Sequence, residues 1–192
     1  MALPDILRTT TVARSRLFEI EELELRFANG AERTYERLPA VGQPAVMIAA
    51  LDDQQRVLLI REYAAGFHEY QLTLPKGAAE AGESLAAAAD RELQEECGFG
   101  ARSIVKLKSL NLSPGHMGFT INVMLARDLY PKRLPADEPE PIEVVPWPLR
   151  RLDELMLRDD FAEARAVAAL HLVQLAIAGD FPTDLHENPH QA

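Results

Sequence analysis

Hydrophobic and polar residues alternate along several short segments of the chain, a pattern that predicts β-strands. Residues 17–38 alternate between Leu23 and Phe27 and then reach Asn29-Gly30, a dipeptide typical of a tight β-hairpin turn. An isolated hairpin is only marginally stable in water. We therefore expect its apolar face to pack either on the rest of the chain or on a second copy of the protein.

Four further segments have the pattern of strands. Residues 45–50 (AVMIAA) form a continuous apolar run, which is typical of a strand covered on both faces. Residues 56–63 (RVLLIREY) follow after a short turn and are expected to pair with that run. Looser alternation predicts strands at 103–112 and 120–126.

One helix is predicted near the end of the chain, at residues 159–180, because alanine is frequent there and favours helix. Asp159 or Asp160 can cap its beginning and Gly179 can end it. Apolar positions recur at helical spacing, which indicates a helix that packs on the core. They are Phe161, Ala164, Ala168, Leu172 and Leu175.

A second helix is predicted within residues 77–99, and its acidic residues are unusually placed. At about 100° per residue, Glu92, Glu95 and Glu96 fall within an arc of roughly 100°. The apolar side of the helix, around Ala88, projects onto the same arc. In an ordinary solvated acidic helix the charges lie opposite the apolar stripe. Here the glutamates continue the apolar side.

Such a cluster of carboxylates needs positive charge nearby. Two carboxylates about 6 Å apart repel by roughly 3 kcal/mol at an effective dielectric constant near 20, and partial burial adds a desolvation penalty. Hard oxygen ligands suit Mg²⁺ or Mn²⁺, which also bind the phosphates of substrates. Arg91 is turned partly away from the acidic arc and can reach back to Glu83.

Composition narrows the possible partners and the compartment. The net charge of −10 argues against nucleic acid as a partner, because affinity for polyanions is built mostly on Lys and Arg. No apolar run is long enough for a signal peptide or a membrane span, so we expect a cytoplasmic protein without a membrane partner. Cys97 is the only cysteine and has no activating base in the sequence around it.

The spacing around the acidic helix resembles the signature of the Nudix hydrolases. Each fixed position of that signature is filled, by Gly77, Glu83, Arg91, Glu92, Leu93, Glu95, Glu96, Gly98 and Phe99. The resemblance implies an α/β fold, an α/β/α sandwich with a mixed sheet, to which this chain adds an N-terminal β-hairpin extension. It also implies an enzyme that binds Mg²⁺ or Mn²⁺ and hydrolyses a diphosphate linked to another moiety.

The resemblance assigns roles within this motif. Glu92, Glu95 and Glu96 are implied to bind the metal, to which the carbonyl of Gly77 adds a ligand. Glu83 and Arg91 are implied to form a pair that holds the motif together.

Arg61 and Arg37 are candidates for binding the substrate. By sequence alone, an arginine directly after the apolar run VLLI either extends out of the core or meets a phosphate with its guanidinium. Resemblance to family members whose arginine here faces the diphosphate favours the second interpretation for Arg61. Arg37, at the end of the predicted hairpin, is a weaker candidate of the same kind.

Two other sites are implied by resemblance to the ADP-ribose pyrophosphatases within the family. A similar Ser-Pro-Gly turn lines their substrate pocket, and this chain carries it at Ser113, Pro114 and Gly115. Phe18 is expected to stack on adenine across a dimer, because the N-terminal extension is similar to the one through which these enzymes form dimers. We therefore expect a homodimer, with packing of the extension within one chain as the alternative.

A proline-rich acidic loop near residue 139 supplies candidates for a general base. It can be an ordinary solvated loop, but Pro139 restricts the backbone between Glu138 and Glu140. The loop resembles the one from which ADP-ribose pyrophosphatases extend acids over the metal. We expect Glu140 to be the base, with Glu138 as the second choice.

These patterns predict an extension over residues 1–43, a hydrolase domain over 44–180 and a tail over 181–192. The whole resembles most the bacterial ADP-compounds hydrolases of the NudE type. The expected reaction is Mg²⁺-dependent hydrolysis of a small nucleotide, namely ADP-ribose, NADH or a diadenosine oligophosphate. Each of these would release AMP. The alternatives are a Nudix hydrolase acting on another nucleotide or on NAD-capped RNA ends, and a sensor that binds ADP-ribose without hydrolysing it.

Overall fold

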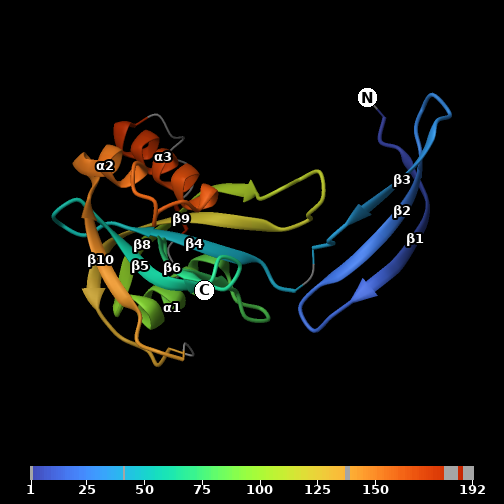
Figure 1. Cartoon of the computed structure of the whole chain (residues 1–192). Coiled ribbons are helices and arrows are strands. Elements are labelled where there is room, and N and C mark those ends of the chain that lie inside the picture. Colours follow the sequence, from blue (N-terminus) through green and yellow to red (C-terminus); the bar gives the residue numbers. More distant parts are fainter. Residues whose placement is uncertain (1, 41, 137–138, 180–185, 188–192) are drawn as a thin grey trace. The chain divides into compact units, whose positions relative to one another are not determined.

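The computed structural model describes the chain except for residues 1, 41, 137–138, 180–185 and 188–192. The described residues form two compact units (Figure 1). The first unit contains the N-terminal residues up to 42 together with the segment 111–120. The second contains the remainder, residues 43–110 and 121 onward.

The first unit is a three-stranded antiparallel sheet. Its strands are β1 (Asp5–Arg14), β2 (Glu19–Arg26) and β3 (Glu32–Arg37), in the order β1-β2-β3. The predicted hairpin is confirmed as β2 and β3. Gly30 has a φ of 80°, a conformation that glycine adopts without strain, and the Asn29 side chain accepts a hydrogen bond from the Ala31 N–H at 3.0 Å.

Strand β1 was not predicted from the sequence. It pairs antiparallel with β2, yet most of its residues are exposed, so no apolar alternation marks it. Its run Thr9-Thr10-Thr11-Val12 is rich in β-branched residues, which favour strands through their own conformational preference. That propensity is the signal by which β1 could have been found.

The second unit is built around a five-stranded mixed sheet in the order β11-β8-β9-β4-β7. Strands β4 and β9 are parallel, whereas β4 and β7 are antiparallel. The predictions for β4, β8 and β9 are confirmed, although β8 and β9 are longer than expected. The strands are β4 (Ala45–Ala50), β7 (Lys76–Ala78), β8 (Phe99–Asn111), β9 (Thr120–Pro131) and β11 (His186–Glu187).

A second, three-stranded sheet has the order β10-β5-β6 and is antiparallel. It consists of β5 (Arg56–Ala64), β6 (Glu69–Thr73) and β10 (Glu143–Pro148). The expectation that β5 pairs with β4 is wrong, because β5 pairs with β10 and β6, and the isolated bridge to Val57 comes from Leu51, just after β4. Both edges of β4 are already occupied, by β9 and β7, so β5 leaves that sheet after the turn.

Strand β10 lies in the part of the chain that looked like a proline-rich loop. It contains Pro146 and Pro148, which donate no backbone hydrogen bond and are normally confined to edge strands. β10 is an edge strand of its sheet, with only β5 beside it. The two prolines are therefore compatible with the pairing, and their presence is what hid the strand in the sequence.

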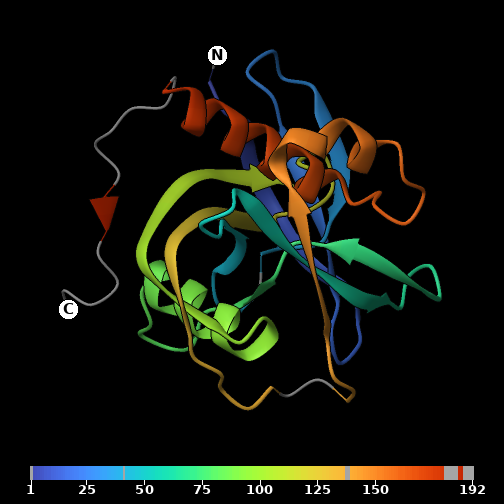
Figure 2. The ribbon, with the colours of Figure 1, turned by 90° about the vertical axis from the view of Figure 1, so that its left-hand side faces the viewer.

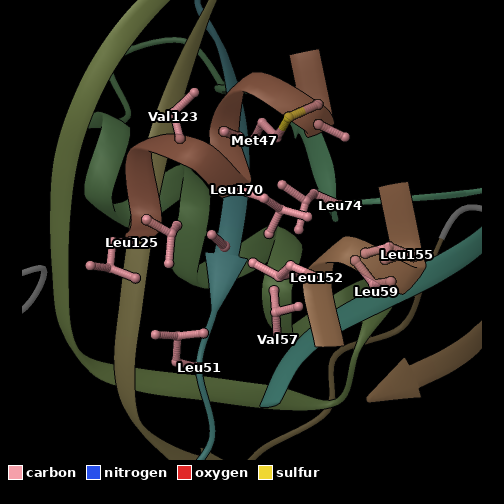
Figure 3. Packing of buried hydrophobic residues seen from close by; sticks show 14 of the residues in the cluster. Met47, Leu51, Val57, Leu59, Leu74, Val123, Leu125, Leu152, Leu155 and Leu170 are labelled. Atoms are coloured by element: carbon pink, nitrogen blue, oxygen red, sulfur yellow. The ribbon is translucent and has the colours of Figure 1, made fainter. Parts of the chain in front are cut away.

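Helices cover both sides of these sheets, which confirms the α/β/α sandwich (Figure 2). Alternate residues of β4 point to opposite sides, as in any strand. Met47 belongs to the core under α2 (Leu152–Met156) and α3 (Ala164–Ala178), shown in Figure 3. Ile48 belongs to the core under α1 (Leu85–Glu96). A short 3₁₀ turn, Leu149–Arg151, precedes α2.

The last helix differs in detail from its prediction. It begins at Ala164 after Glu163, so neither Asp159 nor Asp160 caps it. Of the predicted stripe, Phe161 is buried but precedes the helix, and Leu172 is only partly buried against the core. Gly179 ends it with a φ of 85°, as expected. The buried residues are Ala166, Ala169, Leu170 and Val173.

Within the described part of the chain, no helix is long and apolar enough to cross a membrane.

Asp160 connects the segment before α3 to strand β5, and this contact has a consequence for stability. Arg158 donates to it at 2.7 and 2.8 Å and Arg61 at 3.0 Å. Arg158 first, and then Arg61, lower the pKa of Asp160 to about 2. A carboxyl whose pKa is lowered by folding contributes stability above its unfolded pKa, near 4, and this contribution is lost as the pH falls through the folded value.

We predict that Asp160→Asn lowers the free energy of unfolding by about 1 kcal/mol at pH 6, allowing for solvent screening. The difference from wild type should shrink as the pH falls below about 4. Urea unfolding of both proteins between pH 3 and 6 measures it. The exposed neighbour gives the control, since Asp159→Asn should change stability little at any of these pH values. A constant difference at all pH values would show that the charge of Asp160 is not responsible.

Candidate active site

Helix α1 places the acidic residues, and its ends are defined by local interactions. The Ser84 hydroxyl accepts a hydrogen bond from the Ala87 N–H at 3.2 Å and so caps the first turn. After the helix, Gly98 has a φ of 75°, which ends the helical conformation and directs the chain into β8. Between these ends the alanines pack closely on the sheet, as Ala88 and Ala89 are fully buried.

Glu96 is the most deeply buried of the three clustered glutamates, with 7% of its surface exposed. It accepts a hydrogen bond from the backbone N–H of Lys76 at 3.0 Å. Desolvation nevertheless raises the pKa of Glu96 to about 8. The side chain therefore favours its protonated form at neutral pH unless further positive charge is brought close to it.

Gly77 faces Glu92 across the acidic pocket. A Cβ atom on Gly77 would lie 2.0 Å from the Glu92 Oε1 atom, so any other residue would displace this carboxylate. The pocket has a volume of about 200 Å³. Its lining consists of Lys76, Gly77, Ala78, Glu92, Glu95, Glu96 and Ala136. The structure thus brings together all four residues that the sequence predicted to bind metal.

Arg91 forms the predicted ion pair with Glu83, with distances of 3.2 Å from Nε and 3.1 Å from Nη2. The same guanidinium reaches two of the clustered acids, because Nη1 lies 2.9 Å from both Glu92 and Glu95. It also donates to the backbone carbonyl of Ala78 at 2.9 Å. These carboxylates, with Glu83 the largest contributor, raise the pKa of Arg91 above its usual value. The contacts to Glu92 and Glu95 were not anticipated from the sequence.

The chemistry of this pocket fits a hard divalent cation. Three carboxylates face one small volume beside a close backbone approach at Gly77, and oxygen is the donor that Mg²⁺ and Mn²⁺ prefer. Among the described residues, no three acidic, histidine or cysteine side chains form a ready-made metal site. In the structure the Arg91 guanidinium instead forms ion pairs with Glu92 and Glu95.

A neighbouring pocket of about 340 Å³ contains the candidates Arg61 and Glu140. Arg61 is held by Glu143 at 2.9 Å and by Asp160 at 3.0 Å, so two carboxylates already balance its charge. Glu140 accepts a hydrogen bond from the Tyr70 hydroxyl. The pocket is lined by Arg61, Glu62, Tyr63, Tyr70, Pro139, Glu140, Pro141, Ile142 and Glu143. Glu138 lies outside the described residues.

An ion pair joins the two pockets. Lys76 lines the acidic pocket, Glu62 lines its neighbour, and the Lys76 ammonium donates to the Glu62 carboxylate. Sequence reasoning missed both residues. Lys76 directly precedes Gly77 and Glu62 directly follows Arg61, so their position beside predicted site residues was the available signal.

The other predicted substrate-binding residues belong to the first unit. Phe18 is exposed in the turn between β1 and β2. Arg37 donates from Nε to Glu21 at 2.9 Å. The Ser113-Pro114-Gly115 segment forms the predicted turn, in which the Ser113 carbonyl accepts hydrogen bonds from the N–H groups of His116 and Met117.

Two further features of the second unit are a larger pocket and a buried cysteine. A pocket of about 640 Å³, larger than the acidic one, is bordered by Asp52, Arg102, Arg127 and Ile177 among others, and no residue of the acidic motif except Phe99 lines it. We place the site at the smaller pocket because the carboxylates converge there. Cys97 is buried, and burial raises the pKa of its thiol, so it is unsuited to act as a nucleophile.

Two family models match the chain. Residues 4–37 match the NudE-type Nudix hydrolase N-terminal domain, and residues 42–171 match the NUDIX domain. The second match contains the whole acidic motif.

Individual proteins are similar over nearly the full length. The ADP compounds hydrolase NudE of Escherichia coli (strain K12) is 47% identical over 176 residues, which cover 92% of this chain and 94% of that protein. An ADP-ribose pyrophosphatase of Bacillus subtilis (strain 168) is 25% identical, and the match covers 88% of this chain and 94% of that protein. A crystal structure of an ADP compounds hydrolase superposes with a TM-score of 0.88 at 46% identity, covering 94% of this chain and 97% of that one.

The close approach of Gly77 to Glu92 predicts a selective loss of metal binding. In Gly77→Ala the new methyl group should push the flexible Glu92 carboxylate aside, so affinity for Mn²⁺ should fall by about 10-fold, the size of effect of disturbing a supporting residue of a metal site. Isothermal titration with Mn²⁺ measures this. The melting temperature should change little, because the atom displaced is the end of a flexible side chain.

Gly66→Ala is the matched control, because a Cβ atom there meets no other atom within 4 Å. It should leave Mn²⁺ affinity unchanged. Wild-type affinity in Gly77→Ala would show that Glu92 does not bind the metal from the position described.

Proposed function

The chain belongs to the Nudix hydrolase family, and from this premise we propose that it hydrolyses the diphosphate bond of ADP-containing nucleotides in a Mg²⁺-dependent reaction. The observation that supports this most is the convergence of Glu92, Glu95 and Glu96 around Gly77 in one small pocket. Water would attack one phosphorus of the diphosphate and the bridging P–O bond would break. The products would be AMP and the phosphorylated other half of the substrate.

We propose that Glu92, Glu95 and Glu96, with the carbonyl of Gly77, hold Mg²⁺ or Mn²⁺. When bound, the cation would neutralise charge on the diphosphate and acidify the attacking water. Arg91 and Glu83 would keep the loop before α1 fastened to the helix, since their ion pair spans that connection. The small volume of the pocket, about 200 Å³, suits a cation and phosphate oxygens better than a nucleoside.

Glu140 is our proposed general base, with Glu138 as the alternative. Glu140 lies in the pocket beside the acidic one, and a positioned base of this kind typically contributes ~10²- to 10⁴-fold to the rate. Pro139 and Pro141 on either side restrict its backbone. Such restriction favours a catalytic role over that of a freely moving loop acid.

We propose several residues as contacts for the substrate. Arg61 would contact the diphosphate, and its present partners Glu143 and Asp160 would orient it. Arg37 is a further candidate for a phosphate contact. Ser113, Pro114 and Gly115 would line the substrate pocket, and Phe18 would stack on adenine.

ADP-ribose, NADH and diadenosine oligophosphates are the substrates we propose, each a small molecule with an adenosine on a diphosphate or a longer phosphate chain. The similarity to the Escherichia coli ADP compounds hydrolase and to the Bacillus subtilis ADP-ribose pyrophosphatase supports this class. A role in the cytoplasm would give access to these nucleotides. We place the hydrolase domain at residues 44–180 and a tail at 181–192.

We also propose that residues 1–43 form an extension that mediates a homodimer. Among the residues of its three strands, all of which the structure describes, Leu23 is the one buried apolar residue, whereas Ile6, Val12 and Phe18 of the adjoining turn are each about half exposed. A small sheet that leaves such residues in water gains little stability from its own packing. A second copy of the chain would cover them.

The proposed activity predicts a specific product pattern. Purified protein with Mg²⁺ should release AMP from ADP-ribose, NADH and diadenosine triphosphate, and should act less on a non-adenosine sugar nucleotide and on dGTP. Chromatographic separation of products measures this, and the relative rates identify the preferred substrate. Chelation of the metal with EDTA should abolish turnover. Tight binding of ADP-ribose with no AMP formed would instead favour a sensor.

Two glutamine variants test the assignment of the site. Glu96→Gln should reduce kcat by at least about 100-fold, because it removes a charged ligand from the metal pocket. Glu80→Gln changes an exposed acid in the loop before α1 and should retain wild-type kcat. Turnover of Glu96→Gln within a few-fold of wild type would contradict the proposed metal site.

The proposed dimer predicts a molar mass in solution of about twice the 21.3 kDa of one chain. Light scattering coupled to gel filtration measures it. Val12→Glu should shift the protein towards the monomer, because it would bury a charge in the interface. A wild-type protein that remains monomeric at high concentration would contradict the proposal.

A further inference from the structure

Tyr70 makes a contact with the proposed base that the motif does not account for. It lies on strand β6 and donates its phenolic hydrogen to the carboxylate of Glu140, which precedes β10. The two residues are 70 positions apart in the sequence and meet in the pocket of about 340 Å³ beside the metal pocket. The hydrogen bond to Glu140 raises the pKa of Tyr70, so the phenol remains a donor well above neutral pH.

The position of the Tyr70 ring is determined by the hairpin that carries it. Tyr63 of β5 is its direct partner in the strand pairing, and the two rings meet edge to face with centroids 5.7 Å apart. Tyr63 is held in turn by His68, whose Nδ1 lies 2.6 Å from the Tyr63 hydroxyl. Tyr70 therefore presents its hydroxyl from a supported ring, although its surface is 49% exposed.

The Glu140 side chain needs a partner that fixes its orientation. Prolines on both sides restrict its backbone, but they do not restrict the rotation of the side chain itself. Among the described residues, Tyr70 is the partner with which the Glu140 carboxylate forms its hydrogen bond. This single bond links the loop to the β5–β6 hairpin and selects among the orientations open to the carboxylate.

We propose that Tyr70 is a positioning residue that acts through Glu140, holding this carboxylate in the orientation from which it accepts a proton from the attacking water. The proposal rests on the proposed function, because it requires Glu140 to be the base. It assigns Tyr70 no contact with the substrate. The phenol acts on the rate of the chemical step and has little effect on substrate binding.

The first test separates kcat from KM. Tyr70→Phe removes only the hydroxyl and keeps the ring against Tyr63, so the hairpin should fold as before. With ADP-ribose and Mg²⁺ we expect kcat to fall roughly 10-fold, a part of what a general base contributes, while KM changes less than about twofold. Tyr35→Phe is the matched control, since Tyr35 is similarly exposed but lies on β3 of the other unit.

The second test asks whether Tyr70 acts through Glu140. Glu140→Gln alone should lower kcat by roughly 100-fold. In the double variant Tyr70→Phe/Glu140→Gln, kcat should be no lower than in Glu140→Gln alone, because the Tyr70 hydroxyl would have no base left to position. Circular dichroism and melting temperatures of the variants establish that each is folded.

The outcomes are distinct for the two proposals. Equal losses from Tyr70→Phe in both backgrounds, or a rise in KM alone, would overturn the positioning role. Wild-type kcat in Tyr70→Phe, or in Glu140→Gln, would overturn it as well and leave the proposed hydrolase function standing. An inactive wild-type protein across the whole nucleotide panel would instead contradict the proposed function itself.

Discussion

The crowding of carboxylates on the buried side of α1 is the constraint on which the rest of the site depends. Glu96 is almost fully buried, and Glu92 and Glu95 are only 12% and 19% exposed at their side chains. Carboxylates that are this close together and this shielded from water repel each other and lose hydration. The fold must therefore place positive charge beside them. Arg91 does so from the same helix. Lys76 of β7 does so with its ammonium charge, and its backbone N–H also donates a hydrogen bond to Glu96.

This need for positive charge explains how a stable fold and the proposed metal-dependent reaction can use the same residues. The Arg91 ion pairs with Glu83, Glu92 and Glu95 hold the loop before the helix in place. The same oxygens are the donors that a divalent cation prefers. Gly77 completes the arrangement, because only glycine leaves room for Glu92 at this point.

The residues around the acidic pocket form a second layer that comes from distant parts of the chain. Lys76 and Glu62 connect the acidic pocket to its neighbour, and Tyr70 connects the β5–β6 hairpin to the loop of Glu140. The loop itself enters strand β10, which pairs with β5 beside that hairpin. The three-stranded sheet β10-β5-β6 therefore supports the proposed base in the same way that α1 supports the proposed metal ligands.

The sequence by itself determined the acidic motif and its helix, strands β4, β8 and β9 of the central sheet, and the hairpin β2–β3. These arise from neighbouring residues, such as the spacing of Glu92 to Glu96, the apolar run of β4 and the turn at Gly30. Tertiary structure decided which strands pair and which side chains meet. The prediction that β4 pairs with β5 was wrong for this reason, because β9 and β7 occupy the two edges of β4. Contacts such as Tyr70 to Glu140 join residues far apart in the chain, and no local periodicity encodes them.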